Sequence, residues 1–142
     1  MSVDIITLCQ KKNSDGVWEE VVFPPRTLRR HHDYIFENCN HNVHDFFGRD
    51  LVGMKIPFDP PHPRGVPEGV TIDDDSILVD GFGFTWVSVE ELSNFNYNLD
   101  VDIYYGTEKH SIKLAALLGE DYFIDLSLCK KFGVERIAIG FD

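Results

Sequence analysis

Apolar and polar residues alternate in several stretches of the chain, and this period of two predicts β-strands. Residues 3–9 and 16–23 are rich in β-branched and aromatic side chains, and Asp15-Gly16 between them is typical of a hairpin turn. Residues 134–142 alternate in the same way and predict a terminal strand. The pattern therefore favours an antiparallel sheet.

Two further strands are indicated in the middle of the chain. Residues 51–56 form a short strand candidate. Around residues 99–103, two aspartates alternate with Leu99, Val101 and Ile103. This alternation predicts a strand without showing which of its faces is buried.

Apolar positions three to four residues apart predict helices elsewhere. One helix is expected from about 28 to 40, burying Ile35, Phe36 and Cys39, and the polar stretch 40–42 would end it. Another is expected over 121–132. Its buried face would carry Tyr122, Leu126, Cys129 and Phe132, and Gly133 would follow its last turn.

The clearest helix start is Ser88, which forms a capping box with Glu91. In such a box the Ser88 hydroxyl accepts from the amide of residue 91, and Glu91 reaches back to the start of the helix. A helix from 89 to about 96 would follow, with Leu92 and Phe95 facing inward. Residues 111–118 fit either a strand or a helix.

Five prolines in residues 57–67 predict an extended, irregular segment. Phe58, Val66 and Val70 are expected to anchor it as an ordered loop. A domain boundary here would leave two halves too small to be stable alone. We therefore predict a single domain over residues 1–142, with an α+β fold in which an antiparallel sheet packs against two or three helices.

Composition narrows the classes of function. The chain has 142 residues, 43% of them hydrophobic, and carries 24 acidic and 13 basic residues for a net charge of −11. This charge repels phosphate backbones, so direct nucleic-acid binding is not expected. It would instead favour a protein partner with a basic surface.

The cysteines and the apolar segments indicate the cellular compartment in which the protein is expected. Cys9, Cys39 and Cys129 are few and widely spaced, which is typical of reduced thiols rather than a disulfide framework. No signal peptide is visible, and no apolar run approaches the roughly 20 residues of a membrane span. We expect a soluble, intracellular protein that does not bind a membrane.

Two short motifs are candidates for ligand binding. Arg64 stands in Pro63-Arg64-Gly65-Val66-Pro67, where a rigid backbone would present its guanidinium to a phosphate or carboxylate. Phe82, Phe84 and Trp86 alternate between glycines and would stack on a base if they share one face. The alternatives are an arginine that ties its loop to an acidic neighbour, for which residues 73–75 are candidates, and an aromatic strand that builds the core.

The same motifs resemble a family of small uncharacterised proteins from bacteriophages and prophages. The family pattern has an early Arg-Asn-Tyr-Asp segment, then Pro-Arg-Gly-Leu-Pro, then Gly-His-Ser-His-Ser-Trp-Leu-Thr followed by Glu-Leu, and a closing strand that ends in Phe-Asp. Here the counterparts are residues 30–34, 63–67, 81–92 and 135–142. Phe82 and Phe84 replace both histidines of the family pattern, so any role of those histidines is not expected in this chain.

The resemblance implies a phage origin and a location in the host cytoplasm, but no established activity. From the residues themselves, the ligand contacts we predict are Arg64, Trp86, Phe84, Arg30 and His32, with Arg30 beside Arg64 on the phosphate. No catalytic residue, metal ligand or cofactor is assigned. A histidine-dense stretch from His31 to Asp45 leaves a metal-dependent hydrolase open as an alternative, although its spacing fits no standard zinc motif.

The leading hypothesis is a non-enzymatic binding protein that acts on host physiology or defence. It would capture a small anionic ligand, such as a nucleotide-derived signal, with Arg64 on the phosphate and Trp86 on the base. A second hypothesis is an acidic inhibitor that occupies the basic site of a host protein, as DNA mimics do. A homo-oligomer is possible, because a terminal strand or a hairpin edge would be able to pair between copies.

Overall fold

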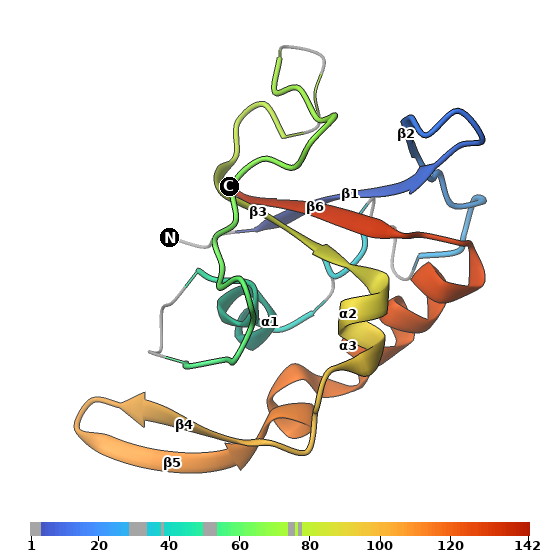
Figure 1. The fold of residues 1–142 in the computed structure, drawn as a ribbon. Coiled ribbons are helices and arrows are strands. Elements are labelled where there is room, and N and C mark those ends of the chain that lie inside the picture. Colours follow the sequence, from blue (N-terminus) through green and yellow to red (C-terminus); the bar gives the residue numbers. More distant parts are fainter. Residues whose placement is uncertain (1–3, 29–33, 38, 50–53, 74–75, 77) are drawn as a thin grey trace.

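The computed structural model describes residues 4–28, 34–37, 39–49, 54–73, 76 and 78–142, and in this part of the chain the main sheet has four antiparallel strands. Their spatial order is β2-β1-β6-β3, so chain neighbours β1 and β2 form one edge hairpin (Figure 1). The strands are β1 (Ile5–Lys12), β2 (Trp18–Glu20), β3 (Phe82–Ser88) and β6 (Arg136–Phe141). The predicted α+β fold class is confirmed.

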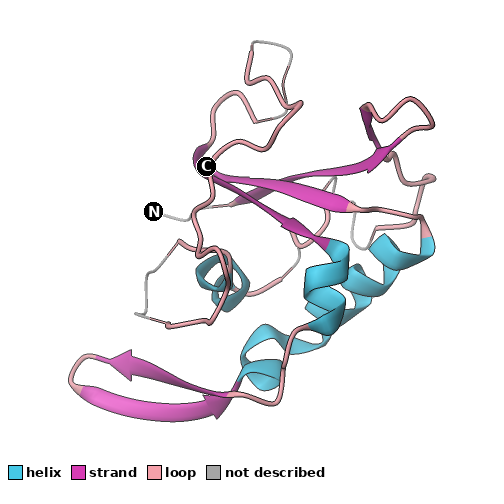
Figure 2. Cartoon of the chain, viewed as in Figure 1, coloured by secondary structure: helices cyan, strands magenta, loops and turns pink. Residues whose placement is uncertain are grey.

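Helices cover one face of this sheet. They are α1 (His41–Phe46), α2 (Val89–Asn94) and α3 (Leu114–Lys131), and they lie on the same side of the sheet in Figure 2. The other face carries Ile6 and Ala138, which pack with Leu78. Leu78 belongs to the long loop between α1 and β3, so the sheet is covered by helices on one face and by this loop on the other.

The predicted terminal strand exists as β6, but it lies in the centre of the sheet and not at an edge. β6 pairs with β1 on one side and with β3 on the other, and all six of its residues are buried. The prediction that this strand has a free edge is therefore wrong. The continuous burial of β6 agrees with its central position, because both of its faces are covered.

A second, two-stranded sheet projects from the body (Figures 1 and 2). It is the hairpin of β4 (Asp100–Tyr105) and β5 (Glu108–Lys113), closed by Gly106 and Thr107. Val101 and Ile103 are its buried positions, so the buried face of the strand predicted around residues 99–103 is the one that carries these two side chains. The ambiguous stretch 111–118 divides at Lys113, where β5 ends and α3 begins.

The core is a cluster of aromatic rings between the helices and the sheet. Phe36 stacks on Tyr122 with ring centroids 5.1 Å apart, and Phe46 contacts Phe58 at 4.9 Å and Tyr122 at 5.8 Å. The Tyr122 hydroxyl lies 2.6 Å from that of Tyr97, so its polar atom has a partner inside the core. These rings bring α1, α3 and the proline-rich segment together.

The predicted helix from 28 to 40 is wrong in the part that the structure describes. Residues 34–37 form turns, and Phe36 has a left-handed backbone with φ of 67°. The Phe36 amide donates to the Asp125 carboxylate of α3 at 2.7 Å, a tertiary bond that replaces a helical one. Ile35 and Phe36 are nevertheless buried, as the pattern predicted, and Cys39 is half-buried.

Two neighbouring predictions also fail. Asn40 begins α1 instead of ending a helix, since its side chain accepts from the Asn42 amide at 2.8 Å as an N-cap. Residues 54–56 of the predicted strand 51–56 have no strand structure, and 51–53 lie outside the described residues. The helix predicted at 121–132 is the second part of α3, which bends at Gly119, and Gly133 has the predicted positive φ.

None of the helices in the described part of the chain is long and apolar enough to cross a membrane.

Candidate functional site

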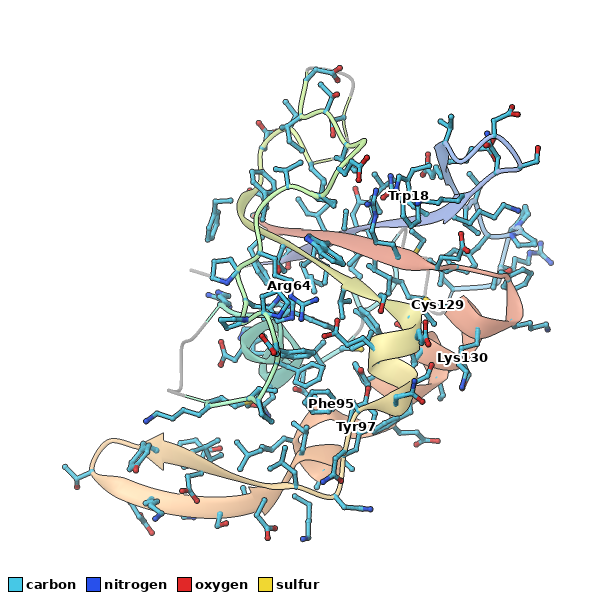
Figure 3. The ribbon with its side chains drawn as sticks, in the orientation of Figure 1. Trp18, Arg64, Phe95, Tyr97, Cys129 and Lys130 are labelled. Carbon is cyan, nitrogen blue, oxygen red and sulfur yellow. The ribbon has the colours of Figure 1, made fainter. Side chains whose placement is uncertain are left out.

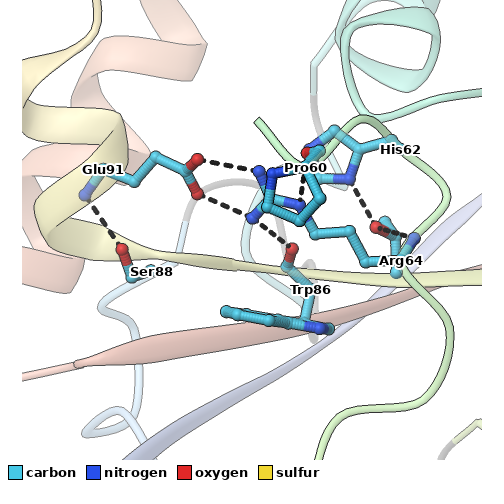
Figure 4. A network of polar contacts seen from close by, with 7 residues as sticks. Pro60, His62, Arg64, Trp86, Ser88 and Glu91 are labelled. Carbon is cyan, nitrogen blue, oxygen red and sulfur yellow. Dashed lines mark hydrogen bonds and ion pairs between the residues drawn. The ribbon is translucent and has the colours of Figure 1, made fainter. Parts of the chain in front are cut away.

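Arg64, the arginine of the proline-flanked motif, lies at the outer edge of β3 near α1 (Figure 3). Its two terminal nitrogens each donate to one oxygen of Glu91 in α2, and both distances are 2.7 Å. Nε donates to the Pro60 carbonyl at 2.9 Å, and Nη1 also donates to the Trp86 carbonyl at 3.2 Å (Figure 4). Four of the five guanidinium N–H groups are therefore used within the protein.

Burial strengthens this network. The Arg64 side chain is 3% exposed and that of Glu91 26% exposed, so the ion pair is largely screened from water. A bidentate arginine–carboxylate pair of this kind is among the stronger polar contacts in proteins. Glu91 therefore occupies both terminal nitrogens with which the Arg64 guanidinium would bind a phosphate bidentately. The phosphate-binding role of Arg64 stays a prediction, and the structure gives this residue a different task.

Trp86 and Arg64 do converge, as the candidate site required, but they converge on each other. The guanidinium carbon lies 5.2 Å from the centre of the Trp86 ring and 5.4 Å from that of Phe58. These are cation–π distances. One face of the half-buried Trp86 ring is therefore already in contact with the arginine.

Phe84 and Phe82 lie apart from this contact. Phe84 packs on the loop-covered face of the sheet, where a Cβ on either Gly81 or Gly140 would lie 3.1 Å from its ring. Phe82 precedes an irregularity in the pairing of β3 with β6, which falls between Phe82 and Thr85, and it is 51% exposed. Arg30 and His32, the other two predicted contacts, lie outside the described residues.

Thr85 and His62 extend the network toward α1. The buried Thr85 hydroxyl accepts from the Arg64 amide at 2.9 Å and is hydrogen-bonded to Nδ1 of His62. Burial, and then the positive charge of Arg64, lowers the pKa of His62 from 6.5 to about 4, although Glu91 opposes the shift. The imidazole is therefore neutral at neutral pH.

Gly48 lets His62 approach the end of α1. A Cβ at Gly48 would lie 2.6 Å from the Cβ of His62, and Gly48 has a φ of +100°. The imidazole also packs edge-on against Phe58 at 4.4 Å and Phe47 at 5.9 Å. The segment 57–64 is thus fixed to β3 through Thr85 and to α1 through His62.

A groove of about 740 Å³ lies beside this segment. Its walls come from the end of α1, from residues 54–63 and from Leu99 just before β4. Most of the lining is apolar or aromatic, and the polar side chains on it are Asp45, Lys55 and His62. No sequence pattern predicts this groove, although the proline-rich segment singled out by the sequence forms one of its walls.

The histidine-dense stretch is partly described. His44 is buried in α1, stacks on His41 at 5.2 Å, and has its pKa lowered from 6.5 to about 4, first by burial and then by His41 and Arg49. Among the described residues, no three histidine, cysteine or acidic side chains are placed to hold a metal ion. His31 and His32 lie outside that part of the chain, so the metal hypothesis is not tested by this arrangement.

No protein-family model, no curated protein and no solved structure matches this chain. The resemblance to the phage family therefore stays a prediction that depends on the motifs themselves. What the structure adds is that Arg64 of the segment 63–67 and both the Trp86 carbonyl and Glu91 of the segment 81–92 form one connected network.

Proposed function

We propose that this protein is a non-enzymatic binding protein that captures a small ligand in the groove between α1 and residues 54–63. Following the resemblance of its motifs, we propose further that it is phage-encoded and acts on host physiology or defence. The observation that carries the proposal is the groove, because its volume of about 740 Å³ is typical of small-molecule sites.

The walls of the groove support binding without large rearrangement. Phe58 is held against His62 and Phe46, and the segment that carries it is fixed through the Arg64–Glu91 ion pair. A site whose walls are already ordered loses little conformational freedom when the ligand enters. In this proposal Arg64 shapes the groove from behind and does not contact the ligand.

The lining favours a ligand with an apolar or planar body and one anionic group. Met54, Ile56 and Leu99 would contact the body, and Lys55, which is exposed, would pair with the anion. A nucleotide-derived signal has this combination. We therefore propose the class of ligand that the sequence predicts, but we propose that it binds in the groove and not at Arg64.

Calorimetric titration with a panel of cyclic nucleotides and ADP-ribose tests this proposal. Lys55→Ala is expected to weaken binding of an anionic ligand about tenfold, as for loss of a charge-assisted hydrogen bond. Lys130→Ala is the matched control, because Lys130 is an exposed lysine of α3 away from the groove (Figure 3). Absence of binding by every ligand, or equal loss in both variants, would contradict the groove as the site.

The second candidate is an acidic inhibitor of a basic host protein, and the net charge of −11 is the observation in its favour. It predicts a stoichiometric protein partner whose binding weakens with salt, because exposed charges are screened. Capture of such a partner, together with no heat from the ligand panel, would favour this candidate over the groove.

A further inference from the structure

The β4–β5 hairpin has two free edges in the described part of the chain. β4 pairs with β5 alone, and no backbone hydrogen bond joins either strand to another described strand. A row of unpaired N–H and C=O groups on such an edge is a template for pairing with another chain. Which edge can pair with another chain therefore depends on the backbone groups and side chains that each strand presents outward.

The register defines which backbone groups point outward. Tyr105 and Glu108 flank the two-residue turn, so this pair exchanges both of its backbone hydrogen bonds. Bonded and non-bonded pairs alternate along an antiparallel ladder. The outward N–H and C=O groups of β4 are consequently those of Asp100, Asp102 and Tyr104.

By the same alternation the outer edge of β5 presents the backbone of three other residues, Lys109, Ser111 and Lys113. Two of these carry lysine side chains that are each 57% exposed. Lysines are a common protection against unwanted strand pairing. The outward positions of β4 carry no lysine, but two of them are the exposed aspartates Asp100 and Asp102.

The β4 edge also exposes two adjacent aromatic residues near the turn. Tyr104 is 49% exposed and Tyr105 is 61% exposed. Its acidic side chains are balanced within the hairpin, since Asp100 lies 3.0 Å from Lys113 and Asp102 lies 3.6 Å from Lys109. This edge therefore offers paired charges and exposed rings beside its free backbone groups.

We propose that the outer edge of β4 binds the same edge of a second copy of this chain. A two-fold axis at Ile103 places Asp102 of one copy opposite Tyr104 of the other, and each such pair exchanges two backbone hydrogen bonds. An axis at Asp102 would instead place two carboxylates opposite each other, which is unfavourable. The Ile103 register therefore gives a closed dimer with a four-stranded sheet across the interface.

The overall charge sets the conditions for this pairing. Two chains of net charge −11 repel each other, and salt screens that repulsion. Dimer formation is therefore expected to strengthen as the salt concentration rises. An interface held mainly by surface ion pairs would show the opposite dependence.

Analytical ultracentrifugation over a wide range of protein and salt concentrations tests the dimer. Asp102→Pro removes an outward N–H from β4 while leaving the bonds to β5, since proline is tolerated where the N–H of an edge strand faces solvent. It is expected to raise the dimer dissociation constant about tenfold or more, because two hydrogen bonds of the interface are lost. Ser111→Pro, the same change on the outer edge of β5, and Asp102→Asn, which removes only the charge, are expected to leave the dimer intact.

Hydrogen exchange of the unmodified protein provides a second test that needs no variant. The amides of Asp102 and Tyr104 are expected to exchange slowly at high protein concentration and fast at low concentration, whereas the Ser111 amide exchanges fast at both. A chain that stays monomeric under all conditions overturns the proposal. So does a dimer in which protection appears at another surface and not at these two amides.

Discussion

The outer edge of β3 is hydrogen-bonded to a loop, whereas the outer edge of β4 has no such partner among the described residues. At β3 the Phe84 carbonyl accepts from the Gly65 amide at 2.9 Å, and the Trp86 carbonyl accepts from Arg64. At β4 no described residue outside the hairpin supplies such a bond. The loop that carries Arg64 and Gly65 therefore covers the β3 edge, and within the described part of the chain the backbone groups of the β4 edge are free for another partner.

The ion pairs at the two edges differ in the same sense. Arg64 and Glu91 are 3% and 26% exposed, whereas Lys113 and Asp100 are 57% and 60% exposed. An ion pair shielded from water is costly to break, while an exposed one contributes little. The comparison teaches that the arginine motif contributes to the stability of the fold, whereas the ion pairs of the hairpin leave the outer edge of β4 free to take the role proposed above.

The largest effect is expected for Arg64→Ala. It leaves the Glu91 carboxylate and the Trp86 carbonyl without their donor, and the free energy of unfolding should fall by about 3 kcal/mol. Urea denaturation measures the loss. The β3 edge also becomes open in this variant, so we expect a new tendency to associate that is seen by size-exclusion chromatography.

Arg64→Lys is the matched variant for this test. Lysine keeps the charge but cannot form the two parallel bonds to Glu91, so it should recover only part of the lost stability. Glu91→Ala made in the Arg64→Ala background should cost much less than Glu91→Ala alone. If the two single changes were additive, the ion pair would not be the source of the stability.

A smaller loss is expected for Thr85→Val, which keeps the shape of the buried side chain but removes its hydroxyl. The Arg64 amide and Nδ1 of His62 then lose their partner, and the free energy of unfolding should fall by about 2 kcal/mol. Thr85→Ser retains the hydroxyl and should lose less. Equal denaturation midpoints for the valine variant and the unmodified protein would rule out this link between β3 and the loop.

We expect acid to weaken the contacts of His62 at the β3 edge before it weakens the β4–β5 hairpin. The pKa of His62 is lowered from 6.5 to about 4, so the folded state favours the neutral imidazole. This contribution to stability is complete above about pH 6.5 and is lost as the pH falls toward 4. In His62→Gln the decrease in unfolding free energy between these pH values should be smaller than in the unmodified protein.

His44 has the same lowered pKa for a similar reason, so His44→Gln should reduce the pH dependence further. A pH profile that neither variant changes would show that carboxylates alone cause the acid sensitivity.

The smallest effect is expected at the hairpin. Lys113→Ala removes an ion pair to Asp100 in which both side chains are more than half exposed, so the unfolding free energy should change by about 0.5 kcal/mol or less. Thermal unfolding of this variant beside Arg64→Ala measures the contrast directly. A loss at Lys113 as large as that at Arg64 would remove the distinction between the two edges.

Local sequence signals predicted the elements that depend on local bonds. The hairpin of β1 and β2, the cap at Ser88 and the alternation of β4 are all confirmed, because each depends on residues a few positions apart. The capping box is confirmed in half. The Ser88 hydroxyl accepts from the Glu91 amide at 3.0 Å, but the Glu91 side chain binds Arg64 instead of reaching back.

The errors come from contacts between distant parts of the chain. The helix expected at 28–40 fails where the Phe36 amide binds Asp125, a residue 89 positions away. The sequence suggests residues 73–75 as the acidic partner of Arg64, whereas the partner is Glu91, which is brought near by the turn from β3 into α2. The groove was not predicted, because its walls come from three separate segments and no single segment shows the concavity.

The central position of β6 has a consequence for the order of folding. Gln10 and Arg136 are 126 positions apart and yet are joined by hydrogen bonds across β1 and β6. Pairings of such long separation close large loops and therefore form slowly. During synthesis, β1 and β3 leave the ribosome well before the strand that joins them. Until β6 has been synthesised, both strands have exposed inner edges, so we expect this chain to be most prone to aggregate before β6 pairs with them.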